Sequence, residues 1–183
     1  MSTIINGTSD AITFPDATIQ NTSAIVGGKV PYTNLPAGSV LQVVQGTYAT
    51  EVGITSGSAT DTGLSVSITP KFSTSKILVL VTQEYLQSAP SGTTLFSTMY
   101  VVRNSTVLIN GNRSISMGVV GASGITQTIA GSTYTMCYLD SPATTSATTY
   151  KTQANVQTVG TGNAIYLQNN ASPSYITVME IAA

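Results

Sequence analysis

The amino-acid sequence predicts an all-β protein, a jelly-roll-like antiparallel β-sandwich with an extended N-terminal arm. The composition favours strands, because the 183 residues are rich in Thr and Ser and only 7% of them are charged, whereas residues that fill helices are scarce. No segment of about eleven or more residues shows the apolar stripe and caps of a helix. From residue 40 onward, short β-rich segments alternate with turn residues, a spacing that is typical of sandwiches and barrels.

Residues 1–36 differ from the rest of the chain and predict an anchoring arm with a linker. Their apolar side chains are dispersed among Asn, Thr, Ser and Asp, so the arm cannot bury them on itself. A glycine pair and two prolines make residues 27–36 a hinge or linker without packed structure. The alternation around Ile12 and Ile19 favours strand addition to another subunit over disorder. The candidate anchoring residues are Ile4, Ile5, Ile12, Phe14, Ile19 and Ile25.

Residues 37–183 predict the sandwich domain. Leu64, Val66 and Ile68 alternate with hydroxyl residues, the pattern of a strand with one solvated face. Ile77–Val81 is apolar without interruption, so we expect a central strand that is covered by the core on one side and by a neighbouring sheet or subunit on the other. The expected strands span 40–48, 64–69, 77–87, 95–103, 106–109, 114–120, 124–129, 133–140, 148–157, 164–168 and 175–181.

Turn signals separate these segments. Asn110–Gly111 is the strongest, since both residues tolerate the positive φ that a type I′ hairpin requires. Asp140–Pro142 and Gly160–Gly162 are weaker turn signals.

Several absences narrow the function. The chain has no His, which argues against His-based catalytic triads and most zinc sites. Its one cysteine, Cys137, cannot form an intrachain disulfide, so stability must come from core burial or from oligomerisation. The net charge of −1 argues against nucleic acid as a partner. No secretory signal or transmembrane segment is evident, so we expect synthesis in a cytoplasm and no membrane partner.

The carboxylates do not suggest an active site. They are spread singly, as turn and solubility residues usually are, and a glycosidase pair is the less favoured reading. Glu84 and Glu180 lie within apolar strands, where we expect them to point outward; a buried acid would need a partner such as Lys76, Arg103 or Lys151. Asp61, Glu51 and nearby threonines could supply oxygen ligands to a calcium ion, but their spacing matches no calcium-binding motif, so no calcium site is predicted. The full set is Asp10, Asp16, Glu51, Asp61, Glu84, Asp140 and Glu180.

Cys137 and the tyrosines have structural interpretations as well as functional ones. Alternation in residues 134–139 places Thr135, Cys137 and Leu139 on one strand face and Tyr134, Met136 and Tyr138 on the other. Without a His as base, we expect Cys137 to be a small buried hydrophobic residue and not a nucleophile. The tyrosines favour a core edge or a subunit interface, and a sugar-stacking platform is the alternative.

Several segments resemble proteins of tailed-phage virions. Ile12–Gln20 is similar to the "PDGTTQ"-type junction of phage fibre proteins, although Ala17 stands where that pattern usually has Gly. Leu35–Val44 and Leu64–Leu80 resemble the start of a β-domain common in cyanophage and marine-phage virion proteins, and Leu139–Lys151 and Ser174–Ala183 resemble its end. Residues 89–133 match no known pattern. The resemblance implies a virion surface protein, attached to a head or a tail, and no catalytic residues.

We therefore expect a non-enzymatic capsid decoration or cement protein without cofactors or metals. The resemblance, together with strands that are apolar on both faces, favours a homotrimer on the virion surface. Its arm would bind the major capsid protein, because 36 residues are short for the shaft of a tail fibre. The alternative is a short tail fibre or receptor-binding protein whose residues 89–133 recognise host surface polysaccharide. A polysaccharide depolymerase is a third possibility, which requires two acids close together in a groove.

Overall fold

A computed structural model describes residues 4–6, 11–13, 19–21, 30–117 and 126–183. Three short strands precede the main body: β1 (Ile4–Asn6), β2 (Ala11–Thr13) and β3 (Ile19–Asn21). They pair antiparallel in the order β1-β2-β3. The described parts of the arm thus form a small sheet, where the sequence alone predicts only an extended segment.

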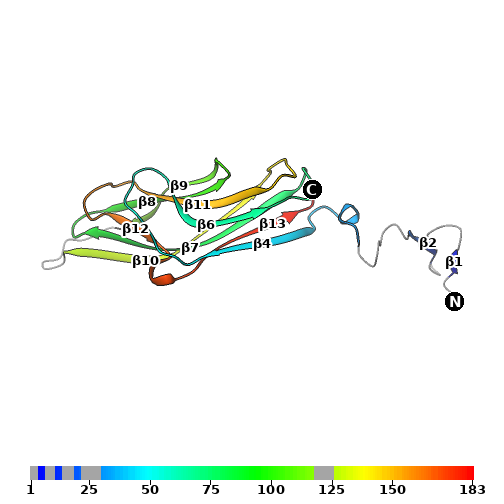
Figure 1. Cartoon of the computed structure of the whole chain (residues 1–183), viewed down its shortest axis with the longest axis horizontal. Coiled ribbons are helices and arrows are strands. Elements are labelled where there is room, and N and C mark those ends of the chain that lie inside the picture. The colour runs from blue at the N-terminus through cyan, green and yellow to red at the C-terminus, as the bar shows by residue number, and fades with distance from the viewer. Residues whose placement is uncertain (1–3, 7–10, 14–18, 22–29, 118–125) are drawn as a thin grey trace.

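The main body is a sandwich of two antiparallel sheets (Figure 1). Short 3-10 turns lie at Tyr32–Asn34 and Asn169–Ala171. The strands are β4 (Val40–Tyr48), β5 (Val52–Ile54), β6 (Thr60–Ile68), β7 (Lys76–Pro90), β8 (Leu95–Arg103), β9 (Thr106–Met117), β10 (Gln127–Asp140), β11 (Thr148–Val156), β12 (Ala164–Leu167) and β13 (Ser174–Ile181).

The two strand orders define a jelly roll. One sheet runs β4-β13-β7-β10, and the other runs β6-β11-β8-β9. If these eight strands are numbered in chain order, the sheets read 1-8-3-6 and 2-7-4-5, which is the double Greek key of a jelly roll. The short strands β12 and β5 extend the first sheet alongside the second half of β7. The fold class expected from the sequence is confirmed.

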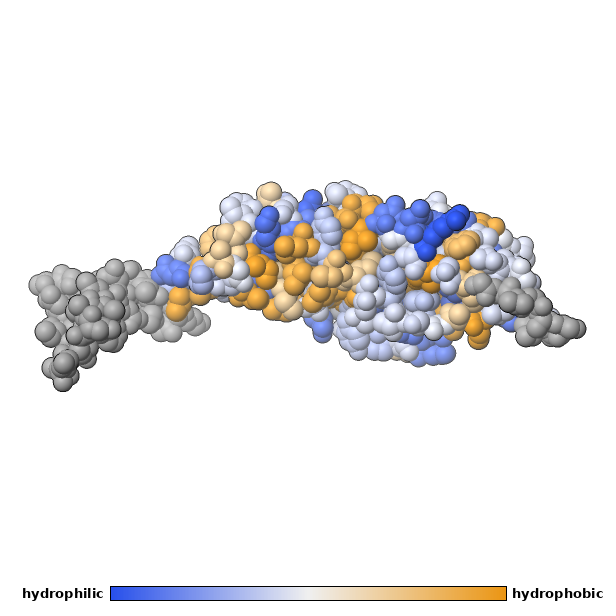
Figure 2. All heavy atoms as spheres, turned by 180° about the vertical axis from the view of Figure 1, so that it is seen from behind, coloured by the Kyte–Doolittle hydropathy of each residue, from blue (hydrophilic) through white to orange (hydrophobic). Residues whose placement is uncertain are grey.

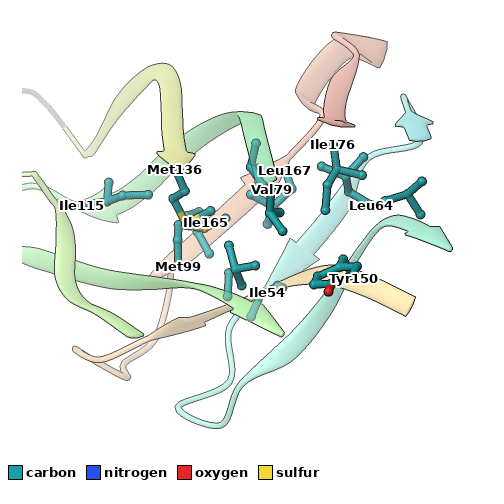
Figure 3. Packing of buried hydrophobic residues seen from close by; sticks show 14 of the residues in the cluster. Ile54, Leu64, Val79, Met99, Ile115, Met136, Tyr150, Ile165, Leu167 and Ile176 are labelled. Atoms are coloured by element: carbon teal, nitrogen blue, oxygen red, sulfur yellow. The ribbon is translucent and has the colours of Figure 1, made fainter. Parts of the chain in front are cut away.

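The core lies between the sheets and takes alternate residues from each strand. Ile77, Val79 and Val81 of β7 are buried because successive side chains of a strand point to opposite faces. Figure 3 shows Met136 and Ile165 of one sheet near Met99 of the other, and Tyr150 on β11 below Ile176 and Leu64. The expectation that residues 77–81 form a central strand is confirmed, with β13 on one edge and β10 on the other.

A buried polar cluster also joins the two sheets. Gln83 of β7 accepts a 2.8 Å hydrogen bond from the Thr152 hydroxyl of β11, and its amide donates one of 2.9 Å to Ser174. Thr62 of β6 lies 2.5 Å from the Thr152 hydroxyl. Because each buried polar group here has a partner, the cluster favours one alignment of the sheets over others.

Strand boundaries follow the sequence prediction where a strand is long and apolar. Residues 40–48 and 95–103 form strands with the expected limits. The two segments expected at 124–129 and 133–140 form one strand, β10, because its backbone pairs with β7 from Gln127 to Asp140 without a register shift. The three residues of β5 were not predicted, although Ile54 is buried in the core.

The predicted hairpin at Asn110–Gly111 is wrong. These residues lie inside β9, opposite Tyr100 and Met99. The chain reverses only at Asn104, whose φ is 52°, between the segments expected as strands 95–103 and 106–109. Tertiary contacts hold this turn: the Asn104 backbone N–H donates to the Thr149 carbonyl at 2.8 Å, and its side-chain oxygen accepts from the Thr149 N–H at 3.0 Å. Gly111 adjoins an irregular pairing between β8 and β9, a usual place for glycine in a strand.

The linker and the C-terminus lie at the same end of the sandwich (Figure 1). The Gly38 N–H donates to the Ala182 carbonyl at 2.8 Å, and the Ala182 N–H donates to the Ser39 carbonyl at 2.9 Å. At the opposite end, Pro90 of β7 pairs with Gln127 of β10. The turn after Pro90 belongs to the unmatched region 89–133. It is about 45 Å from the linker, because fourteen residues of strand β7 lie between the two ends of the sandwich.

Candidate interaction surfaces

The outer face of the β4-β13-β7-β10 sheet carries a continuous row of apolar residues near its linker end. Cross-strand pairing aligns four apolar residues in one row: Val43 opposite Met179, Met179 opposite Leu78, and Leu78 opposite Leu139. In the next outward-facing row, Leu80 pairs with Cys137 on one side and with Thr177 on the other, and Thr177 pairs with Gln45. We call this surface, formed by the outward side chains of β4, β13, β7 and β10, the apolar face.

The side chains of the apolar face are accessible at its two margins. Val43 is 55% exposed and Leu139 is 56% exposed, whereas Leu78 and Met179 between them are partly buried by their neighbours. Figure 2 shows hydrophobic side chains gathered on the half of the sandwich next to the linker. Contiguous apolar surface of this kind is typical of interaction sites.

The opposite sheet presents a polar face. Asp61 of β6 pairs with Gln153 of β11, Gln153 pairs with Tyr100 of β8, and Tyr100 pairs with Asn110 of β9. Lys151 adds a charge beside them, 2.8 Å from the Asp61 carboxylate. Partial burial acts to raise the pKa of Asp61, but the hydrogen bonds from Lys151 and Gln153 and the charge of Lys151 together lower that pKa. The two outer faces of the sandwich therefore differ in chemistry.

The structure places the carboxylates of the main body among separate partners. Asp61 binds Lys151, and Glu51 accepts a 2.7 Å hydrogen bond from Asn169. Glu84 points outward, as predicted, and accepts a 2.9 Å hydrogen bond from Thr133. Asp10 and Asp16 lie outside the described residues, and the described residues contain no group of acidic or sulfur ligands that would hold a metal ion.

Asp140 connects the two sheets near the linker end. It lies at the end of β10 and accepts two 2.8 Å hydrogen bonds from one terminal nitrogen of Arg103 on β8. It also accepts a 2.7 Å hydrogen bond from the hydroxyl of the buried Tyr150 on β11. Burial and the adjacent Asp140 carboxylate raise the pKa of Tyr150 far above its ordinary value. The sequence named Arg103 as a possible partner for a buried acid, but for Glu84 or Glu180 and not for Asp140.

Glu180 is fully buried, so the prediction that it points outward is wrong. Its carboxylate accepts hydrogen bonds of 2.6 Å from the Gln42 amide, 2.6 Å from the Lys71 backbone N–H and 3.3 Å from the Phe72 backbone N–H. The loop before β7 thus supplies donors in place of a cationic partner. No sequence signal marks this arrangement, because it depends on a loop folding back over the strand.

Cys137 is exposed, so the prediction that it is buried is also wrong. The predicted alternation is present, since Met136 faces the core while Thr135, Cys137 and Leu139 are exposed. The alternation did not reveal which face is covered. In the described part of the chain β10 is the edge strand of its sheet, and nothing there covers its outward side.

The structure brings some of the predicted anchoring residues together along the backbone. Ile5 pairs with Ile12 across β1 and β2, and Ile19 pairs with Thr13 across β3 and β2. Ile4 also lies in β1. Phe14 and Ile25 lie outside the described residues. No helix in the described part of the chain has the length and apolar character needed to cross a membrane.

Comparisons with known proteins assign no family. No protein-family model and no curated protein matches the chain. Among solved structures it is similar to dimeric latent PorU from Porphyromonas gingivalis, at 13% identity and a TM-score of 0.34, covering 80% of this chain and 13% of that chain.

Structures of two strains of one virus are also similar. For infectious bursal disease virus, the Gt strain structure matches at 14% identity and a TM-score of 0.35, covering 94% of this chain and 47% of that chain. The Gx strain structure matches at 15% and 0.32, covering 78% and 37%. The chain therefore spans less than half the length of each of these three structures.

Proposed function

We propose that this chain is a structural protein of a tailed-phage virion, a capsid decoration or cement protein that binds the major capsid protein through its N-terminal arm. The observation that carries the proposal is the arrangement along the sandwich. The linker from the arm joins one end of a jelly roll, beside the C-terminus, and the turns of the unmatched region 89–133 include those at the other end. Such a chain is built to anchor at one end and project at the other.

The chemistry of the main body agrees with a binding role. Its five carboxylates are each engaged by separate hydrogen-bond donors, such as Asn169 for Glu51 and Thr133 for Glu84. The proposal therefore includes no catalytic activity, cofactor or metal. The virion surface, with assembly in the host cytoplasm, is the proposed location.

The arm supplies the proposed contact with the capsid. Its short strands β1, β2 and β3 each carry isoleucine beside polar residues, and strand addition to an exposed capsid edge would bury Ile12, Phe14, Ile19 and Ile25. Apolar area removed from water contributes about 25 cal/mol per Å². Several arms in one oligomer would raise the avidity further.

Deletion of residues 1–30 tests the proposal. The sandwich retains all strands from β4 to β13, so the shortened protein should stay folded by circular dichroism but should no longer sediment with purified heads that lack the protein. A full-length sample is the matched control. Full occupancy of heads by the shortened protein would refute the anchoring role of the arm.

A short tail fibre that recognises host polysaccharide is the second candidate. The observation in its favour is that turns of the unmatched region lie at the end away from the linker, where Pro90 pairs with Gln127. Binding of the purified protein to host cells, abolished by replacing residues 91–94 with a Gly-Ser turn, would favour this function over the first.

A further inference from the structure

We infer that the apolar face binds the same face of a second copy of this chain, with the β7 strands of the two copies antiparallel. This inference concerns self-association and stands independently of where in a virion the protein is located.

The size of the apolar face fits such a contact. Four adjacent strands about 4.8 Å apart span about 19 Å, and the nine residues from Lys76 to Glu84 extend about 27 Å. The face therefore measures about 500 Å² in plan, and its corrugated accessible surface is larger. A stable protein interface buries roughly 600–1,000 Å² on each partner, so one sheet face is an adequate contact area.

Charge favours a second copy as the partner. In the described part of the chain, the outward side chains of β4, β13, β7 and β10 include only two charges, Lys76 and Glu84, since Asp140 and Glu180 are buried. Both lie on β7, with Leu80 midway between them. When two faces stack with antiparallel β7 strands around Leu80, each Lys76 lies over the Glu84 of the other copy. The face is thus complementary to itself, as a two-fold contact requires.

Apolar and amphipathic rows meet in the same arrangement. The row of Gln45, Thr177, Leu80 and Cys137 stacks on its own copy, with the Gln45 amide already donating to the Thr177 hydroxyl at 3.0 Å. Tyr175 of β13 pairs with Thr82 of β7 and forms a second row. The row that contains Val43, Leu78 and Leu139 stacks on this second row of the other copy. Threonine methyl groups and a tyrosine ring suit apolar neighbours. No charged side chain of the described residues is left facing an apolar row.

The charged residues cannot pair within one chain. Lys76 donates to Ser141 at 2.8 Å, and Glu84 accepts from Thr133 at 2.9 Å. About 27 Å of strand separates the two residues, several times the screening length of about 8 Å at physiological salt. If a substitution at Lys76 is compensated by one at Glu84, the two side chains must therefore come from different chains.

The mass of the full-length chain in solution is the first test. Light scattering should give twice the chain mass of 18.8 kDa, because a two-fold contact closes with two copies. Val43→Lys should give the monomer mass, whereas the matched control Val107→Lys, at 50% exposure on β9, should stay dimeric. A monomeric wild-type chain, or a closed trimer as the sequence leads us to expect, would overturn the inference.

Charge reversal is the second test and identifies the antiparallel arrangement. Lys76→Glu and Glu84→Lys should each weaken the dimer at least tenfold, because like charges then face each other across the contact. The double variant K76E/E84K should restore the dissociation constant to within about threefold of the wild-type value. Equal weakening by the double variant and the single variants would overturn the arrangement, and circular dichroism checks that each variant is folded.

Discussion

The buried carboxylate of Glu180 accepts a 2.6 Å hydrogen bond from the backbone N–H of Lys71. Glu180 lies near the end of β13, and Lys71 lies in the loop between β6 and β7, so the contact attaches that loop to the sheet beside the C-terminus. The loop is adjacent to the linker, where the Lys71 ammonium lies 5.8 Å from the centre of the Tyr32 ring. The contact therefore stabilises the end of the sandwich from which the arm leaves.

Glu180→Gln should destabilise the protein by about 2–3 kcal/mol, because an amide offers one acceptor oxygen and leaves buried donors near Lys71 without partners. Urea unfolding at neutral pH measures the free energy. Glu51→Gln, at an exposed carboxylate with one hydrogen bond, is the control and should change stability by less than about 0.5 kcal/mol. A Glu180 variant as stable as this control would contradict the anchoring role.

Tyr150 should make the protein sensitive to alkaline pH. Burial and Asp140 raise its folded-state pKa above the unfolded value of about 10. A raised pKa contributes stability that is complete below pH about 10 and is lost as the pH rises further, because the unfolded state releases its proton first. The difference in unfolding free energy between wild-type and Tyr150→Phe proteins should therefore stay constant from pH about 7 to pH about 10 and should shrink above pH about 10.

At neutral pH, Tyr150→Phe should cost about 1–2 kcal/mol through the lost hydrogen bond to Asp140. Tyr32→Phe is the control, since Tyr32 is exposed. A difference between the wild type and the Tyr150 variant that also stays constant above pH about 10 would show that the phenol does not titrate differently in the folded state.

Gly46→Ala should destabilise the sandwich by about 2–4 kcal/mol. Gly46 lies in β4 where the strand crosses β6, and a Cβ there would overlap the backbone carbonyl of Ser65. Backbone cannot give way as a flexible side chain can. Thermal unfolding measures the loss, and Gly160→Ala, which meets only the side chain of Asn163, should cost less than about 1 kcal/mol. Similar losses in both variants would argue against a close approach of the sheets at Gly46.

The copy number of the chain in virions should approach that of the major capsid protein. A decoration protein occupies every equivalent site of a capsid lattice, whereas a fibre is attached at a few positions. Quantitative mass spectrometry of purified virions measures the ratio. A copy number equal to that of tail components would instead favour the fibre, and residues 91–94 would then be the first to mutate.

The fold class and most of the strands are predictable from local sequence patterns. Residues 40–48 and 95–103 form strands with the predicted limits because β-branched and apolar residues act locally and the turns on either side end them. The alternation around Met136 likewise assigned the correct residues to each side of β10, because side chains alternate in any strand.

Contacts between distant residues decided what several local patterns left open. Asn110 and Gly111 continue β9 without a turn because they pair with Tyr100 and Met99 of β8, whereas the turn at Asn104 is held by Thr149, which bonds its backbone and side chain. Glu180 is buried because the loop at Lys71 covers it, and Cys137 is exposed because β10 lies at the edge of its sheet. Each outcome depends on contacts between residues far apart in the chain, and a periodic pattern along one strand carries no information about what will be packed against it.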